Sequence, residues 1–308
     1  MPPAHQPLLP VAALLVNAFV WGLSWYPFRR LDALGMHSLW ATAWIYGFAA
    51  LVIFARRVQA PALVLRSRWL LGLAFASGFT NACFNWGVTI GEVVRVVLLF
   101  YLMPVWAVLL ARWLLREPLS ASALLRTGLA VAGAAVVMWQ PGLGLPLPAS
   151  LADWLGLAGG AGFALTNVLL RRQAGDPAEA RAFAMFAGGV VVPALLAGTL
   201  AWGGVGVHWP AIGGPVAVLA TATGVAFLVA NLALQFGAAR LPTGVTAVVM
   251  LSEVLFASIS AVLLGDETLS ARTLAGGGLI VAASVLAALQ PVIASGASGS
   301  GPGPAKGT

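Results

Sequence analysis

The chain has 308 residues, of which 60% are hydrophobic and only 8% charged, whereas a soluble domain carries about a quarter charged residues. This composition excludes a soluble globular protein, because no such fold could bury so much apolar surface, and it indicates lipid as the solvent. The formal net charge of +7 would suggest nucleic acid in a soluble protein, but here the basic residues lie between apolar runs, as membrane orientation signals do, so we expect no nucleic-acid partner.

A membrane-spanning helix needs about 20 mainly apolar residues. We predict ten such helices along the chain, at residues 9–28, 37–55, 69–89, 94–115, 121–139, 152–170, 181–201, 214–237, 243–264 and 270–290. The residues before the first run, MPPAHQP, hold no Lys or Arg, so we interpret that run as a helix and not as a signal peptide. The Gly/Ser/Pro-rich end, residues 293–308, predicts a disordered tail.

The loop charges predict the orientation. With the N-terminus inside the cell, the external side keeps four basic residues, Arg29, Arg30, Arg95 and Arg272. The cytoplasmic side then holds the other twelve: Arg56, Arg57, Arg66, Arg68, Arg112, Arg116, Arg126, Arg171, Arg172, Arg181, Arg240 and Lys306. Because cytoplasmic loops are rich in Lys and Arg, this split favours both termini in the cytoplasm.

One pattern occurs twice, in residues 92–141 and 242–291: an apolar run, a short acidic turn and a second apolar run. A shift of 150 positions superposes Glu117 on Glu267 without a gap. That shift spans five predicted helices, an odd number, so the two units would insert in opposite orientations, as in many secondary transporters. We therefore predict an all-α integral membrane fold with two inverted five-helix repeats, residues 1–145 and 146–292.

The runs YLMPVWAVLLARWLLREPLS (101–120) and SEVLFASISAVLLGDETLS (252–270) resemble the paired EamA-type units of the drug/metabolite transporter superfamily. The resemblance covers about residues 8–290 and implies ten helices in two inverted repeats and transport of small metabolites, often outward. The residues that match the two unit patterns are Tyr101, Pro104 and Glu117, then Glu253 and Glu267. Val254 stands where the second unit usually has Pro after the Glu, which weakens the expectation of a helix break beside Glu253.

Amides inside the predicted helices are the first candidates for substrate binding, because polar side chains in a bilayer are costly unless they face protein or water. Asn81 and Asn85 share one face of the third helix, and Asn231 and Gln235 repeat this on the eighth, still 150 positions away. Amides both donate and accept, so the pairs could bind the ammonium and carboxylate of an amino acid. The alternative is that they form hydrogen bonds between helices.

Three further residues are candidates for coupling or movement. Glu253 lies near mid-depth of the ninth helix, either as a site of proton coupling, as the partner of a substrate cation, or as a protonated Glu bonded to a neighbouring helix. Arg95 either pairs with Glu92, reaches outward to water, or meets an anionic group of the substrate. Pro104 should bend the fourth helix, as a hinge or for packing.

Aromatic residues complete the candidate pocket, with 12 Trp, 14 Phe and 3 Tyr in the chain. An offset of 142 aligns Trp21 with Phe163 and Trp25 with Asn167. The predicted substrate-binding set joins these four residues and the amides to three more, Ser24, Phe100 and Tyr101. The rings could stack on flat or apolar groups, and the alternative for Trp and Tyr is a place in the belts at the membrane surface.

These patterns favour a secondary transporter of small metabolites that works by alternating access. Amino acids, aromatic or otherwise apolar, fit the candidate pocket best, with export as the direction and the inner membrane of a bacterium as the location. The sequence has no phosphate-binding Gly-Lys-Ser/Thr loop, no cluster with metal-ligand spacing and no nucleophile–base pair, so we expect neither an enzyme nor a cofactor. The alternatives are a passive channel and a lipid-handling protein; membrane lipid is a partner in each case, and the oligomeric state stays open.

Overall fold

Helices form the part of the chain that the structure, a computed structural model, describes: residues 8–115, 121–139, 147–173 and 175–289. Those residues contain no strand, which confirms the predicted all-α class. The helices are α1 (Leu8–Gly22), α2 (Trp25–Ala33), α3 (Ser38–Arg56), α4 (Ala60–Arg66), α5 (Arg68–Ile90), α6 (Val93–Phe100), α7 (Met103–Leu110) with a π-helical turn (Ala111–Leu115), α8 (Ala121–Met138), α9 (Leu151–Arg172), α10 (Ala178–Trp202), α11 (Gly214–Ala238), α12 (Thr243–Met250), α13 (Ser252–Leu264) and α14 (Ala271–Ala288). Glu117 and the predicted tail at 293–308 lie outside the described residues.

Each of the ten predicted segments coincides with one helix or with a broken helix. Seven spans of the described chain are long and apolar enough to cross a membrane. The pair α4 and α5 makes an eighth if it counts as one span bent by 104°. The chain is therefore a multi-pass membrane protein by helix length and composition, while the count of ten spans and the inverted repeat stay predictions.

Polar side chains fix where several of these apolar helices begin. Ser67 Oγ accepts from Leu70 N at the start of α5, Ser150 caps α9, and Ser270 caps α14. At the start of α3, His37 Nδ1 accepts from Leu39 N at 3.2 Å. Burial lowers the pKa of His37, and nearby Asp32 raises it by less, so the neutral ring that can accept this hydrogen bond is favoured.

Three helical spans are broken near the middle of the chain's apolar runs. α1 stops at Gly22 and α2 resumes at Trp25. The other two breaks, at Tyr101 between α6 and α7 and at Leu251 between α12 and α13, lie 150 positions apart, the offset of the sequence repeat. Pro104 is the second residue of α7, where a missing N–H is tolerated. A break thus also occurs two residues before Glu253, although position 254 is not proline.

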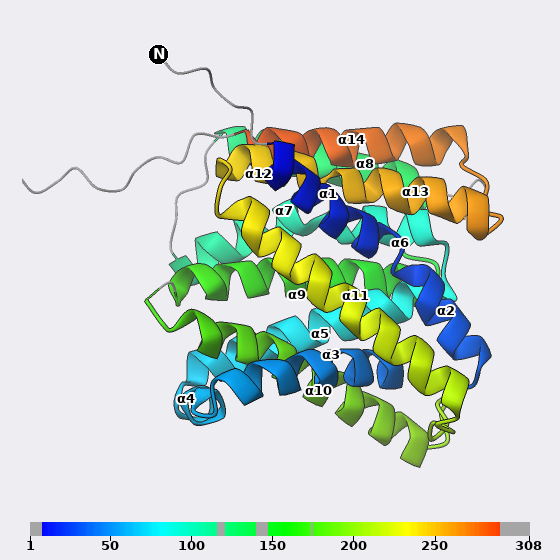
Figure 1. Cartoon of the computed structure of the whole chain (residues 1–308). Coiled ribbons are helices and arrows are strands. Elements are labelled where there is room, and N and C mark those ends of the chain that lie inside the picture. The colour runs from blue at the N-terminus through cyan, green and yellow to red at the C-terminus, as the bar shows by residue number, and fades with distance from the viewer. Residues whose placement is uncertain (1–7, 116–120, 140–146, 174, 290–308) are drawn as a thin grey trace, which may run out of the picture.

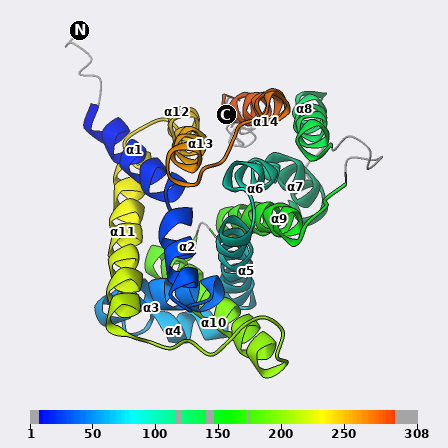
Figure 2. The same cartoon turned by 90° about the vertical axis from the view of Figure 1, so that its right-hand side faces the viewer.

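The long helices run side by side and are arranged as a ring (Figures 1 and 2). α1 and α11 stand on one side and α5, α6 and α9 on the other, while α3 and α10 join them along one edge. α5 packs closely on α10 because both helices carry glycine at the crossing, Gly78 and Gly188. α14 packs on α8, and α13 packs on α1 and α6.

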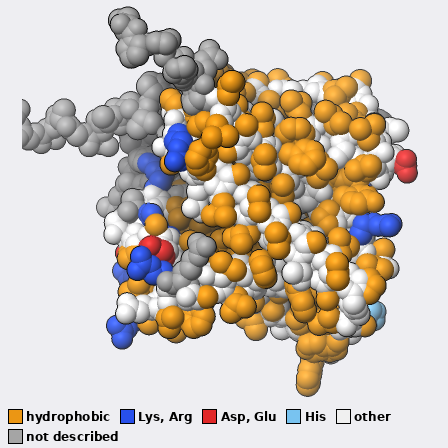
Figure 3. Space-filling model, viewed as in Figure 1, with side chains coloured by type: hydrophobic (Ala, Val, Ile, Leu, Met, Phe, Trp, Pro, Cys, Tyr) orange, Lys and Arg blue, Asp and Glu red, His pale blue; other side chains and the backbone are white. Residues whose placement is uncertain are grey.

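The two ends of the ring differ. The α2 end, at the right of Figure 1, is formed by α2, the turn between α5 and α6, and the turn after α13. The opposite end, which we call the α4 end, carries α4 and the start of α12. Exposed arginines at this end include Arg57, Arg66, Arg68, Arg171, Arg172 and Arg240. The space-filling surface in Figure 3 is hollowed toward this α4 end.

Candidate functional site

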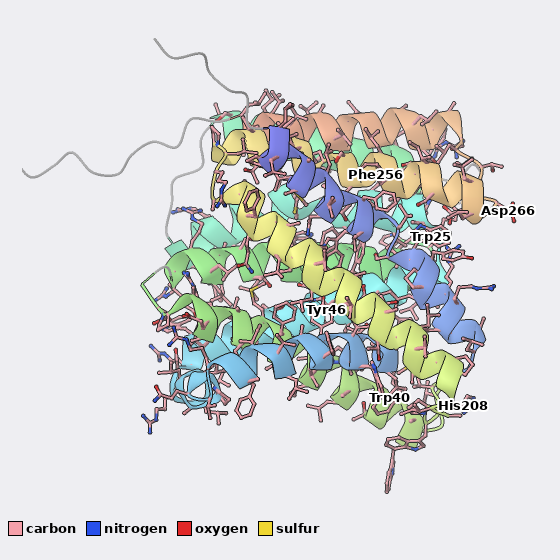
Figure 4. The ribbon with its side chains drawn as sticks, viewed as in Figure 1. Trp25, Trp40, Tyr46, His208, Phe256 and Asp266 are labelled. Atoms are coloured by element: carbon pink, nitrogen blue, oxygen red, sulfur yellow. The ribbon has the colours of Figure 1, made fainter. Side chains whose placement is uncertain are left out.

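Four aromatic side chains from four helices meet inside the ring, and we call them the aromatic cluster: Trp21 on α1, Tyr46 on α3, Phe186 on α10 and Phe227 on α11. The ring centroids of Trp21 and Phe227 are 4.6 Å apart, and Tyr46 lies 6.3 Å from Phe227 and 5.7 Å from Phe186. Tyr46 lies about midway between the two ends of the molecule (Figure 4). These distances are typical of favourable ring pairs, and since Tyr46 and Phe227 are 6% and 5% exposed, the rings pack mainly on one another.

Asn81 attaches the aromatic cluster to α5. The Tyr46 hydroxyl donates to Asn81 Oδ1, and Asn81 Nδ2 donates to the Ser77 carbonyl at 2.8 Å. Gly189 on α10 leaves the space that the Tyr46 ring fills, since a Cβ at that position would overlap the ring. Asn81 is only partly buried and its Oδ1 can accept a second hydrogen bond, so the amide could still bind a polar group of a substrate.

A second group of residues surrounds the two symmetric helix breaks. Tyr101 donates its hydroxyl hydrogen to Glu253 Oε2 at 3.3 Å, which joins the α6–α7 break to the α12–α13 break. Phe100 lies 4.9 Å from Phe84 and 5.5 Å from Phe163, measured between ring centroids. Three of the predicted residues, Phe100, Tyr101 and Phe163, are therefore close together, with Glu253 beside them.

The two groups are neighbours because they share helices. Asn81 and Phe84 are three residues apart on α5 and so lie on nearby faces. Trp21 of the aromatic cluster precedes Gly22, and a Cβ on Gly22 would come within 2.9 Å of the Glu253 carbonyl. The close approach at Gly22 therefore sets Glu253 next to the helix that carries Trp21. Together the two groups hold aromatic rings, the Asn81 amide, the Tyr46 and Tyr101 hydroxyls and the Glu253 carboxylate.

Asn85 does not share the surroundings of Asn81. Its side chain is fully buried and donates through Nδ2 to Thr42 Oγ1 at 3.0 Å, which ties α5 to α3. Asn85 Oδ1 has no hydrogen-bond partner within the described chain, and neither has the buried Ser38 hydroxyl at the start of α3. These contacts match the alternative in which the amide bonds two helices.

The other predicted amides lie nearer the α4 end. Gln235 Nε2 donates to Asn231 Oδ1 at 2.6 Å, and Gln235 is exposed. Asn167, on α9, is also exposed. The hydrogen bond between Asn231 and Gln235 shows that this pair acts as one polar unit on α11.

Ser24 and Trp25 lie at the α1–α2 break and not in the aromatic cluster. Ser24 is 2% exposed. Trp25 Nε1 donates to Ser260 Oγ on α13 at 2.9 Å, and the Trp25 ring carries the Arg29 guanidinium at 4.8 Å from its centroid. Both residues therefore belong to the packing of the α2 end.

Arg95 forms an ion pair with a residue that the sequence pattern did not suggest. Its Nε and Nη2 donate to the two carboxylate oxygens of Asp153 at 2.6 and 2.8 Å, and its Nη1 donates to the Val137 carbonyl at 2.8 Å. The Asp153 side chain is 2% exposed and also accepts from Ala149 N at 2.9 Å. A forked pair of this kind fixes α6 against α9, and it leaves the guanidinium fully engaged.

Sequence reasoning missed Tyr46, Phe186, Phe227 and Asp153. Tyr46 carries a weak signal, since it is a phenol in the middle of an apolar run, but its bond to Asn81 depends on tertiary packing. Phe186 and Phe227 have no such signal because phenylalanine is ordinary in lipid-facing and core positions alike. Asp153 could have been found by asking which acid lies at the same predicted membrane depth as Arg95.

The described residues contain no group of three His, Cys, Asp or Glu residues that could hold a metal ion. Cys83, the one cysteine of the sequence, is buried and free.

Comparisons with known proteins point the same way. Residues 8–139 match the family model described as EamA-like transporter family. A solved structure titled "Crystal structure of protein" matches with a TM-score of 0.53 and 18% identity, covering 90% of this chain and 96% of that one, and at this identity it shows the fold alone. No curated protein matches the chain.

Members of the matched family are membrane transporters of small molecules. The family match covers α1 to α8, which include Trp21, Tyr46, Asn81 and Tyr101 of the site. The structural match adds a similar fold over nearly the whole length. Residues 8–139 are therefore similar to the EamA-like transporter family, and the chain as a whole has a fold similar to that of the solved structure.

Proposed function

We propose that the protein carries small metabolites, namely amino acids with aromatic or other apolar side chains, across the bacterial inner membrane, outward and by alternating access. Two observations support this most: aromatic rings and the Asn81 amide lie in one group, and the Tyr101 hydroxyl meets the Glu253 carboxylate in a neighbouring group at the two helix breaks. An amino acid has the matching parts: an ammonium, a carboxylate and an apolar side chain.

Each part of the site has a role in this proposal. The Glu253 carboxylate binds the substrate ammonium, with the Tyr101 hydroxyl beside it. Asn81 donates toward the substrate carboxylate, and Trp21 and Phe227 stack on the apolar side chain. Because a lone carboxylate at this depth is costly to ionise, proton binding to Glu253 and substrate binding exclude one another, which would couple the two.

The broken helices support transport by alternating access. Breaks at Tyr101 and Leu251 are 150 positions apart, as two inverted five-helix units require, and broken helices near mid-membrane are a common feature of secondary transporters. In this proposal the halves 1–145 and 146–292 exchange conformations, with both termini in the cytoplasm. The site then opens to one end and afterwards to the other.

Counterflow in proteoliposomes tests the function. Vesicles loaded with unlabelled phenylalanine should accumulate labelled phenylalanine transiently, and the rate should saturate. Trp21→Ala should lower this rate about tenfold, the value of a lost ring contact with burial. Trp154→Ala is the matched control, because Trp154 is 59% exposed, and it should keep the parent rate.

Glu253→Gln separates binding from coupling. If Glu253 binds the proton, the variant keeps counterflow, although weakened, and loses acceleration by a pH gradient. If a pH gradient still accelerates transport by this variant, Glu253 is not the site of proton coupling. Flux that neither saturates nor shows counterflow would replace the transporter with a passive channel, and movement of labelled lipid without amino-acid flux would replace it with a lipid-handling protein.

A further inference from the structure

Glu267 binds the first turn of α6 from the other half of the chain. Its Oε1 accepts from Val93 N at 2.8 Å, and its Oε2 lies 3.4 Å from Val94 N. The side chain is 12% exposed. A carboxylate at a helix N-terminus is stabilised by the unpaired N–H groups and by the helix dipole. Glu267 thus ties the turn after α13 to the start of α6.

Arg29, on α2, completes this group. Its Nη2 donates to Glu267 Oε1 at 3.1 Å and to the Gly91 carbonyl at 2.6 Å, and its Nε donates to the Val88 carbonyl at 3.1 Å. The two carbonyls lie at the C-terminal end of α5, where backbone acceptors are left unpaired. One guanidinium therefore connects α2, the α5–α6 turn and the α13–α14 turn.

Two features hold Arg29 and Glu267 in place. Trp25 stacks on the Arg29 guanidinium and donates to Ser260 Oγ on α13. Asp266, directly before Glu267, has φ of 53°, which a side chain rarely adopts, and it projects outward at the α2 end in Figure 4.

We propose that Arg29 and Glu267 form a latch that closes the α2 end of the bundle and must open for substrate to pass that end. This inference rests on the proposed transport function. The two residues join segments from both halves of the chain, so any movement of one half against the other at this end has to separate them. Arg95 and Asp153 also join the two halves, but they lie on α6 and α9, which pack directly on one another, and not on turns at the end of the bundle.

The partial exposure of the Arg29 side chain is compatible with a contact that forms and breaks during transport. The Arg29 side chain is 27% exposed, so water can replace its carbonyl partners when the latch opens, whereas Asp153 is 2% exposed. α2 is also separated from α1 by the break at residues 23–24, where α2 can tilt relative to α1. The latch residues lie away from the substrate groups, so they control access and not binding.

Cysteine labelling tests the latch without any substrate. In a Cys83→Ala chain in nanodiscs, a Ser24→Cys reporter, at a position 2% exposed in the closed α2 end, should react slowly with a membrane-impermeant maleimide. Glu267→Gln and Arg29→Gln should each raise this rate about tenfold, the effect of losing a hydrogen bond to a charged group. A Gln235→Cys reporter near the α4 end should react more slowly in the same variants.

Asp266→Asn is the matched control. It removes the neighbouring exposed carboxylate while keeping a residue that tolerates positive φ, so the Ser24→Cys rate should not change. Native Cys83, 5% exposed, reports unfolding in chains that retain it. If Cys83 also becomes reactive, the Gln variants have unfolded, and the latch is tested instead with the milder Arg29→Lys. This variant keeps the charge but loses the forked donors, and its Ser24→Cys labelling rate is the measurement. Unchanged Ser24→Cys rates in folded latch variants would overturn the latch, whereas a failed counterflow assay alone would overturn only the transport function.

Discussion

The ion pair of Arg95 and Asp153 is largely shielded from solvent, and among the described residues no second carboxylate forms a salt bridge with the guanidinium. Removing one partner of such a pair leaves an uncompensated charge, which costs several kcal/mol. We therefore expect Asp153→Asn to lower the free energy of unfolding by about 3 kcal/mol, measured as a fall in the thermal midpoint in detergent.

A second ion pair provides the control for that prediction. Arg57 and Glu179 are 3.2 Å apart, and their side chains are 65% and 47% exposed. Exposed pairs contribute about 0–1 kcal/mol, so Glu179→Gln should leave the midpoint almost unchanged. Equal losses in the two variants would mean that Asp153 does not stabilise the bundle through Arg95.

At the scale of single residues, the sequence predicted which positions carry polarity better than it predicted their partners. Asn81 and Glu253 lie in the candidate site, but Asn85 bonds α3 and Trp25 bonds α13. Residue type and helix position could be read from one segment at a time. The partner of a side chain depends on which helices cross and at what depth. That depends on tertiary packing and cannot be read from any one segment of the sequence.

At the scale of the helices, the crossing of α5 and α10 depends on glycine. A Cβ on Gly188 would overlap the Ala74 carbonyl, which is backbone and cannot move aside cheaply. We expect Gly188→Ala to cost about 1–3 kcal/mol, the usual penalty of overpacking. Gly198, on the same helix, has nothing within 4 Å of an added Cβ, so Gly198→Ala should be neutral or stabilising. Comparison of the two thermal midpoints checks this, and equal midpoints would contradict it.

The apolar runs predicted the helices well, because a length of about 20 apolar residues is a property of one segment. The breaks were harder to predict. Pro104 indicated the one at Tyr101, and Pro27 lies just after the break between Gly22 and Trp25, where its missing N–H cannot bond the Leu23 carbonyl. The break at Leu251 has no proline beside it.

At the scale of the whole molecule, the repeat in the sequence and the placement of charges support one orientation of the protein in the membrane. The α4 end gathers exposed arginines, and the α2 end is closed by Arg29 and Glu267. If basic residues mark the cytoplasmic side, the closed end faces outward and the end toward which the surface is hollowed faces the cytoplasm (Figure 3). The structure then represents a form open to the inside, the side from which an exporter takes its substrate.

Sided labelling tests this orientation in intact cells. On a Cys83→Ala chain, a Thr268→Cys variant in the exposed turn after α13 should react with an impermeant maleimide added outside. An Arg240→Cys variant, exposed at the α4 end, should react only after the membrane is permeabilised. Arg240 is one of many basic residues at its end, so its loss leaves the charge asymmetry that sets the orientation largely intact. The reverse pattern would place the Arg29–Glu267 contact at the cytoplasmic face, and the same form of the protein would then be open to the outside.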